Sequence, residues 1–441
     1  MDRRVLVRLA CCLSLAAVLV ALGGCDSKRK TASPAPRGAV IMGIDALDWQ
    51  VLEPLLAAGE APTFARLRDQ SASGVCLSFV PLEKSPLIWA SIATGLEPAQ
   101  HGVGGFVKPR GHDDYDVLTS AADWRAPALW DIAAAADLTS CVIGWWVTFP
   151  ARDLRGVMVS DHVSFTEAGN RNPEGLVRPA ALTEELAALT VDYRAVPVEL
   201  LQDLAPNADP DELADPSHRD WTKLRLALAG DLTYLATAKH LLAQGTYDLF
   251  AVYFRGLDLV CHAYWQYYQP GDGAPPAAAD RERLGTIVPG YYRVLDRWLA
   301  ELMPLLANAA NLIVVSDHGF YGPRRDRAGN MQKGVAEHRA EGVLIVRSAL
   351  YEPGARFDRS FVLNVAPTAL ALLGLPPSRE MPGRILRDGL TPAGLAFVES
   401  LEANRLASYA ALAPQPPAAV ADDPAVDEAI RRQLRSLGYV D

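Results

Sequence analysis

The sequence predicts an α/β fold in which helices sandwich a mostly parallel sheet. Four short apolar runs have the composition of strands buried on both faces, which is typical of parallel sheets. These runs cover residues 39–44, 249–254, 312–315 and 343–346. Segments with helical patterns lie between the runs, and such alternation along a chain indicates an α/β fold.

Three helices are expected close to these strands. The first covers residues 48–56, directly after the first apolar run. The second begins at Ser85-Pro86 and closes at Thr94-Gly95, because a serine–proline start and a glycine end are typical of helix caps. The third covers residues 288–306.

The composition is that of a globular protein. The 441 residues are 50% apolar and 21% charged, and a chain of this length can bury a sizeable core. The net charge of −10 argues against general binding to nucleic-acid backbones, which are also negative. Cys76, Cys141 and Cys261 are too few and scattered for a disulfide framework, although one bridge is possible, and no Cys-x-x-Cys pair supports a thiolate zinc site.

Residues 1–24 have the features of a secretory signal peptide. Three early arginines precede an apolar run over 9–22, which is shorter than the ~20 residues of a bilayer span. The small residues before Cys25 resemble the lipobox of bacterial lipoproteins, in which the cysteine is lipidated. We therefore expect a membrane anchor at Cys25 and a protein on the extracytoplasmic side of the bacterial cell envelope. The alternative is an uncleaved N-terminal anchor.

The rest of the chain divides by composition. Residues 25–38 are a polar tether, and residues 39–400 form the main domain. Within it, residues 151–240 contain no comparable apolar run and are expected to be a mainly helical cap insertion. Residues 401–441 combine an Ala/Pro-rich linker with a C-terminal helix.

Acidic residues follow three of the apolar runs. Asp45 ends the first run, Asp258 follows the second, and Asp317-His318 follows the third. Ligands of open parallel sheets bind beyond the carboxyl ends of the strands, so these side chains are expected to converge. Any one such aspartate is more often a helix cap or a turn residue.

Two histidines extend this acidic group. Asp258 and His262 are four residues apart, which places both side chains on one face of a helix. His338 precedes the fourth apolar run and could complete a three-ligand site. Asp and His are good ligands for zinc and acceptable ones for manganese. The alternatives are a surface Asp with a packed His, and an ordinary loop histidine at position 338.

Ser85 is the candidate nucleophile. A serine at a helix N-terminus faces the positive end of the helix dipole, which favours an anionic phosphoryl group. A nearby metal ion could lower the pKa of the hydroxyl and make it nucleophilic at neutral pH. The alternative is that Ser85 is only a helix cap.

Together these residues resemble the type I phosphodiesterase/nucleotide pyrophosphatase branch of the alkaline phosphatase superfamily. The matching segments occur in family order over residues 39–375: Gly43-Ile44-Asp45, Pro62-Thr63-Phe64, Ser85-Pro86, Thr94-Gly95, His101-Gly102, Ser316-Asp317-His318-Gly319-Phe320 and His338-Arg339. The resemblance implies that residues 39–400 are an alkaline-phosphatase-like catalytic domain with a sheet sandwiched by helices.

The resemblance also implies a mechanism and its ligands. Family enzymes hold two divalent metal ions, usually zinc, and hydrolyse phosphate esters through a covalent intermediate on a hydroxyl. One ion would be held by Asp258, His262 and His338. The other would be held by Asp45, Asp317 and His318, with Ser85 reaching toward it. The expected substrate is a small-molecule or lipid phosphate ester, either a diester or a monoester.

Two departures from the family pattern limit the substrate. Nucleotide pyrophosphatases carry a threonine nucleophile and an asparagine further along the same helix, whereas this chain has Ser85 and no asparagine up to Gly95. This difference argues against nucleotide substrates. The run 85–89 does not fit the motif from which sulfatases make formylglycine. Lys84 and Arg255 are candidates to bind a phosphate oxygen, although both are more simply explained as solvated charges.

Two other functions stay open. One is a transferase that passes a phosphoryl-linked group to a lipid or glycan head group instead of water. The other is a non-catalytic envelope lipoprotein that keeps only the fold.

Overall fold

The computed structural model describes residues 38–108, 117–165, 174–272, 274–306, 311–322, 324–332, 337–417 and 424–437. The predicted signal peptide, Cys25 and nearly all of the tether lie outside these ranges, so they stay predictions. Among the described residues, no helix combines the length and the apolar character needed to cross a membrane.

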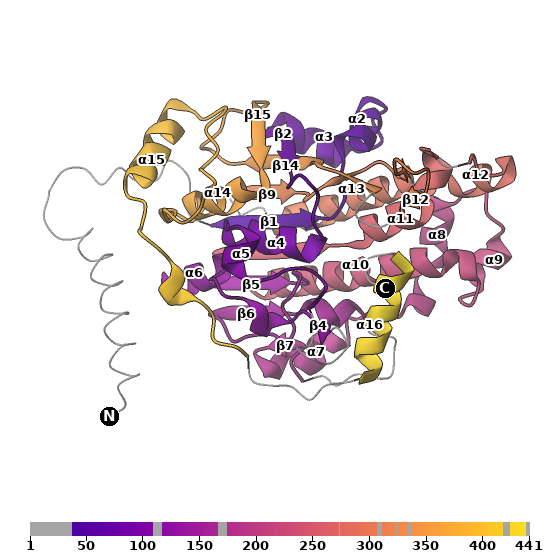
Figure 1. The fold of residues 1–441 in the computed structure, drawn as a ribbon, viewed down its shortest axis with the longest axis horizontal. Coiled ribbons are helices and arrows are strands. Elements are labelled where there is room, and N and C mark those ends of the chain that lie inside the picture. Colours follow the sequence, from indigo (N-terminus) through magenta and orange to yellow (C-terminus); the bar gives the residue numbers. More distant parts are fainter. Residues whose placement is uncertain are drawn as a thin grey trace, which may run out of the picture.

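The core of the molecule is one nine-stranded sheet (Figure 1). Its strands, in spatial order, are β15 (Arg356–Phe361), β2 (Ala72–Leu77), β14 (Glu341–Arg347), β9 (Leu312–Val315), β1 (Ala39–Ile44), β8 (Leu249–Phe254), β5 (Ser140–Ile143), β6 (Gly156–Val159) and β7 (Val177–Arg178). The five strands from β9 to β6 are mutually parallel, whereas β14 and β7 run antiparallel to their neighbours. The predicted α/β fold with a mostly parallel sheet is confirmed.

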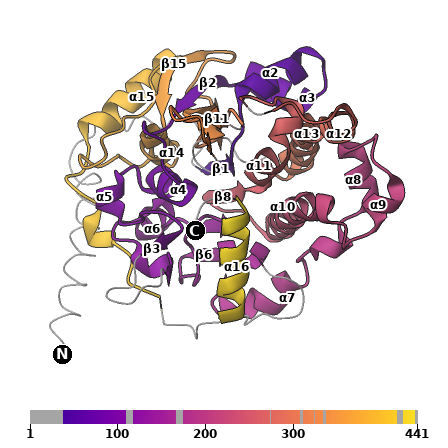
Figure 2. The same cartoon turned by 45° about the vertical axis from the view of Figure 1, so that its right-hand side comes forward.

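Helices cover both faces of this sheet, as Figures 1 and 2 show. The helices that pack against the sheet are α2 (Trp49–Ala57), α3 (Pro62–Asp69), α4 (Ser85–Thr94), α6 (Leu129–Ala135), α10 (Arg219–Gln244), α11 (Gly256–Tyr268), α13 (Ile287–Leu305) and α14 (Val365–Leu372). The other helices are α5 (Pro98–His101), α7 (Thr183–Ala187), α8 (Val198–Leu204), α9 (Pro210–Ala214), α12 (Ala278–Leu284), α15 (Pro392–Ala403) and α16 (Pro424–Leu437).

Strand β1 divides the apolar interior into two cores. Val40, Met42 and Ile44 pack with residues of α2, α3, α10, α11 and α13. Ala39 and Ile41 point to the opposite face and pack with α4, α6 and α14. This alternation follows from the two-residue period of a strand and explains why the whole run is apolar.

The register of the central strands aligns their carboxyl ends. Ile44 of β1 lies beside Phe254 of β8, and Gly43 lies beside Val315 of β9. Residues that follow these strands therefore lie at one edge of the sheet. Asp45, Asp258 and Asp317 are among these residues.

The segment 151–240 differs from its prediction in one respect. It begins with β6 and β7, which belong to the main sheet, before its helices follow. The expectation of no buried strand there is wrong because β6 is only four residues long and begins at a glycine. The long helix α10 also packs against the main core. The domain boundaries as a whole stay a prediction.

The three cysteines of the main domain are buried and free. No disulfide links them to one another, so the bridge that the sequence left possible is not formed between Cys76, Cys141 and Cys261.

Close packing between β1 and α4 yields a test of the fold. A Cβ atom at Gly43 would lie 2.6 Å from the ring of Trp89, which is fully buried. Gly43→Ala should therefore lower the free energy of unfolding by about 1–3 kcal/mol, the usual range for overpacked cores. Urea denaturation measures the change. Gly104→Ala is the matched control because a Cβ there meets open space. Equal stability of both variants would contradict the packing described.

Candidate active site

Four elements bring the predicted residues to one edge of the sheet. Asp45 directly follows β1, and Asp317-His318 follows β9 after the single residue Ser316. Asp258 and His262 lie on α11, which begins soon after β8. His338 lies on β13 (His338–Arg339), which pairs with β10 (Gly319–Phe320) and is thereby held beside His318.

The first group consists of Asp258, His262 and His338. Asp258 Oδ1 lies 3.4 Å from His262 Nε2 and 3.3 Å from His338 Nε2. The two Nε2 atoms are 2.9 Å apart. The three side chains are 7% exposed or less, so three donor atoms converge on one buried point. The structure brings together the three residues that the sequence assigned to one metal ion, and their role as ligands stays a prediction.

The second group consists of Asp45, Asp317 and His318. His318 Nε2 lies 3.1 Å from Asp45 Oδ1 and 3.6 Å from Asp317 Oδ2. The ring of His318 also stacks on that of His338, with centroids 3.7 Å apart. The two groups therefore adjoin, and donor atoms of Asp258, His318 and His338 also lie within 4.8 Å of one another.

The chemistry of these atoms fits divalent metal ions. Asp45 Oδ1 and both carboxylate oxygens of Asp317 are buried and make no hydrogen bond to any described residue. Buried polar atoms usually have partners, since an unpaired one costs free energy. A divalent cation prefers such carboxylate oxygens and imidazole nitrogens and would supply the missing partner.

Burial and mutual charge shift the pKa values of three residues in these two groups. Burial and the neighbouring Asp45 carboxylate raise the pKa of Asp317 well above its usual range. Burial opposes charge on His318, but the Asp317 and Asp45 carboxylates raise its pKa to about 10. Burial, reinforced by His318, lowers the pKa of His338 to about 3. A neutral imidazole such as that of His338 is the form that binds metal.

Ser85 is the first residue of α4 rather than its cap. Lys84 occupies the N-cap position, and no side chain caps the helix. Ser85 Oγ is buried and makes no hydrogen bond to any described residue. The interpretation of Ser85 as only a helix cap is therefore wrong, because its hydroxyl does not bond to the helix amides.

Aromatic contacts fix α4 against the aspartates. Trp89 of α4 packs on Tyr253 of β8, with ring centroids 4.7 Å apart. The Tyr253 hydroxyl in turn donates a hydrogen bond to Asp45. A hydrogen bond of 2.9 Å joins His101 Nε2 to the Ser91 hydroxyl and ties α4 to the segment that follows it.

A second layer of polar contacts orients the histidines. Glu337 Oε2 lies 2.9 Å from His262 Nδ1, and the carbonyl of Gly319 lies 3.0 Å from His318 Nδ1. Each contact favours a hydrogen on Nδ1, so that in the neutral imidazole the Nε2 lone pair would be directed at the site, as in many metal centres. Sequence reasoning missed Glu337, although its position next to His338 was a signal.

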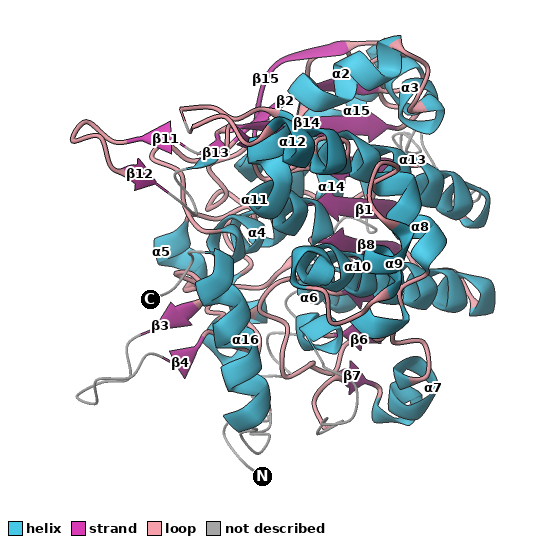
Figure 3. Ribbon diagram, turned by 90° about the vertical axis from the view of Figure 1, so that its right-hand side faces the viewer, coloured by secondary structure: helices cyan, strands magenta, loops and turns pink. Residues whose placement is uncertain are grey.

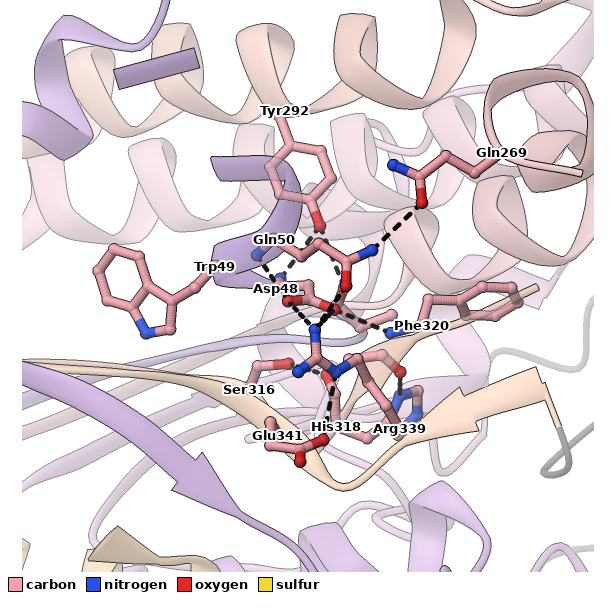
Figure 4. A network of polar contacts seen from close by, with 12 residues as sticks. Asp48, Trp49, Gln50, Gln269, Tyr292, Ser316, His318, Phe320, Arg339 and Glu341 are labelled. Atoms are coloured by element: carbon pink, nitrogen blue, oxygen red, sulfur yellow. Dashed lines mark hydrogen bonds and ion pairs between the residues drawn. The ribbon is translucent and has the colours of Figure 1, made fainter. Parts of the chain in front are cut away.

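Asp48 holds the two loops of the site together (Figure 4). Its carboxylate accepts from the backbone N–H of Phe320 at 3.2 Å and from Arg339 at 3.3 Å. The Tyr292 hydroxyl accepts from the backbone N–H of Asp48 and lies 3.3 Å from the carbonyl of Ala46. Ala46 has a φ of 61°, a left-handed conformation that alanine rarely adopts, so this bond supports the turn that presents Asp45.

Asp231 positions the start of α11. Its carboxylate accepts from the backbone N–H of Arg255 and Gly256, each at 3.1 Å, and from the Tyr291 hydroxyl at 2.9 Å. Burial raises the pKa of Asp231 to about 7. Arg255 is itself buried and donates to the carbonyl of Ser164, so it is not the solvated charge that the sequence suggested. Lys84 is half-buried.

One family profile covers most of the chain. The profile of the family described as type I phosphodiesterase / nucleotide pyrophosphatase matches residues 39–362. The chain belongs to this family. The predicted family and the predicted class of enzyme, a phosphoric ester hydrolase, are confirmed at the level of the family. No curated protein sequence matches the chain significantly.

Two solved structures are similar to the chain at low identity. Phosphonoacetate hydrolase from Sinorhizobium meliloti 1021, in complex with phosphonoformate, is 21% identical over 67% of this chain, with a TM-score of 0.42. The match spans 59% of that hydrolase. Murine ectonucleotide pyrophosphatase/phosphodiesterase 5 is 11% identical over 77% of this chain and 96% of its own, with a TM-score of 0.43.

The contact between Glu337 and His262 can be tested through metal affinity. Glu337→Gln should weaken zinc binding about 10- to 100-fold, since a neutral amide no longer enforces the Nδ1–H tautomer of His262. Competition with a chromogenic chelator measures the affinity. Glu352→Gln, an exposed glutamate elsewhere on the surface, is the control. An unchanged affinity of the Glu337 variant would show that this carboxylate does not orient the histidine.

Proposed function

We propose that the protein hydrolyses phosphate esters, diesters above all, with Ser85 as the nucleophile and two divalent metal ions as cofactors. One observation carries the proposal: two adjoining groups of buried Asp and His side chains are coupled through Tyr253 to the helix that begins at Ser85. Carboxylate oxygens in the second group make no hydrogen bond to any described residue. Membership of a phosphodiesterase family supports the same reaction.

The ligand sets follow from the two groups. Asp258, His262 and His338 would hold one ion, and Asp45, Asp317 and His318 would hold the other, with zinc or manganese suited to both. When bound, such ions supply positive charge that stabilises the attacking and leaving oxygens and lowers the pKa of a nearby hydroxyl.

The residues of the chain then perform a substitution in two steps. Ser85 Oγ loses its proton to solvent and forms a bond to phosphorus, while the bond from phosphorus to the leaving alcohol breaks and that alcohol takes up a proton. The intermediate is a phosphodiester of Ser85 that keeps the second alcohol of the substrate. Water then attacks its phosphorus, breaks the Oγ–P bond, restores the serine hydroxyl and releases a phosphate monoester.

The start of α4 assists both steps electrostatically. Ser85 lies at the positive end of the helix dipole, which favours the anionic phosphoryl group. The N–H groups of Leu87 and Ile88 already donate to the carbonyl of Lys84, so they are not free to bind a phosphoryl oxygen. The helix dipole therefore contributes more to phosphoryl binding here than these two amides do. The lack of an asparagine between Ser85 and Gly95 favours substrates other than nucleotides.

Ser85→Ala tests the nucleophile. The variant should lose at least about 10³-fold in kcat toward bis(4-nitrophenyl) phosphate, because no covalent intermediate can form. Its metal content should match that of the unaltered chain. Ser91→Ala lies on the same helix and loses only its bond to His101, so it should retain most activity. Turnover of the Ser85 variant at the normal rate would exclude the proposed nucleophile. Activity that appears only with an added alcohol acceptor would favour a transferase instead.

The location is also part of the proposal. Residues 1–25 have the pattern of a lipoprotein signal, which supports a lipid anchor at Cys25 on the extracytoplasmic side of a bacterial membrane. Mass spectrometry of the full-length chain made in a bacterium should find residues 1–24 removed and acyl chains on Cys25. An intact, unmodified N-terminus would exclude the anchor.

A further inference from the structure

The start of α4 forms part of the wall of a pocket. Its wall includes Pro86, the residue after Ser85, together with Phe106, Leu118 and Trp146. Trp146 Nε1 donates to the Tyr253 hydroxyl at 2.6 Å, and that hydroxyl donates to Asp45. The pocket is thus connected to the site both along the chain and through two hydrogen bonds.

The C-terminal helix α16 forms one wall of this pocket. Ile430 and Leu434 complete its wall and are each only 3% exposed. The two residues are four apart and lie on one face of the helix, whereas Arg432 and Arg435 are exposed. Figures 2 and 3 show α16 across the edge of the sheet toward which β1 and β8 point.

With α16 in this position, the pocket is too small for a substrate group. Its volume is about 20 Å³, which is room for roughly one water molecule. The apolar side chains of Ile430 and Leu434 therefore take up room on one side of this pocket.

The wall selects for apolar, uncharged groups. The described residues that line the pocket include no Lys or Arg that could pair with a second phosphate. Asp161 uses its carboxylate to accept from the backbone N–H groups of Val147 and Thr148, at 2.9 and 3.2 Å. His162 stacks on Phe149 with ring centroids 4.1 Å apart, and burial lowers its pKa, which keeps it neutral. A second anionic group would find no cation among these lining residues, whereas an alkyl chain would find mostly apolar and aromatic contacts.

We propose that this pocket is the subsite for an alkyl substituent of a phosphodiester and that α16 holds it shut. Ile430 and Leu434 occupy the place of the alkyl group, which displaces them when the substrate binds. That the substrate is a phosphodiester rests on the reaction proposed for Ser85. That the pocket is blocked rests only on the position of α16.

Kinetics of the full chain test the closure. The double variant Ile430→Asp/Leu434→Asp should raise kcat/KM for octyl 4-nitrophenyl phosphate about tenfold, mainly through a lower KM, because the competing conformation is weakened. The rate for methyl 4-nitrophenyl phosphate should change far less. Arg432→Asp, on the exposed face of α16, should alter neither. A ratio of octyl to methyl rates equal to or below that of the unaltered chain would overturn the proposal.

Hydrogen exchange provides a second readout that needs neither turnover nor a variant. Octyl phosphate, below its critical micelle concentration, should speed amide exchange in residues 424–437 of the unaltered chain, whereas methyl phosphate should not. Exchange in α16 that does not respond to octyl phosphate would overturn the subsite even if Ser85 is confirmed. A response without hydrolysis of any ester would instead reject the reaction proposed for Ser85 and retain the subsite.

Discussion

The active site depends on burying three carboxylates, those of Asp45, Asp258 and Asp317, close to one another at the edge of a sheet. Removing a single ion from water costs several kcal/mol, and like charges add to this cost. Three histidines offset part of this cost. They do not offset all of it, because burial still raises the pKa of Asp317 and both of its carboxylate oxygens make no hydrogen bond to any described residue. A fold that retains such a group has a use for it, and binding of divalent cations is the use that these donor atoms suit.

Such a group can persist only if its surroundings hold it in place. Tyr253 donates to Asp45, Glu337 contacts His262, and Asp48 joins the loop at Phe320 to the turn after β1. These supporting groups come from separate parts of the chain, and each is itself buried. The proposed ligands are therefore oriented by buried side chains rather than by the loops that carry the ligands. We expect the site to be as rigid as the sheet beside it.

The sequence predicts the parts of this arrangement that depend on local pattern. Buried parallel strands are continuous apolar runs, so their ends, and with them Asp45 and Asp317, can be located without a structure. The short strand β6 could not be found because four residues beginning at glycine carry little signal. Tyr253 and Asp231 could not be found either, because nothing in a buried strand or a helix interior marks a residue whose partner is distant in sequence. For Ser85 the pattern predicted the helix start within one residue, but that one residue decides whether the hydroxyl caps the helix or stays free.

For the C-terminal helix α16, the sequence predicts the element but not its neighbours. Its amphipathic pattern predicts a helix, but the pattern does not say what its apolar face covers. Only the fold shows that Ile430 and Leu434 meet Phe106 and Trp146, which lie some three hundred residues earlier, beside the start of α4. Among the described side chains of α16, the buried apolar ones are Ile430 and Leu434, so this helix has less to hold it than the strands of the core. A ligand with comparable apolar surface can therefore compete for that place, whereas it could not displace the aromatic floor beneath.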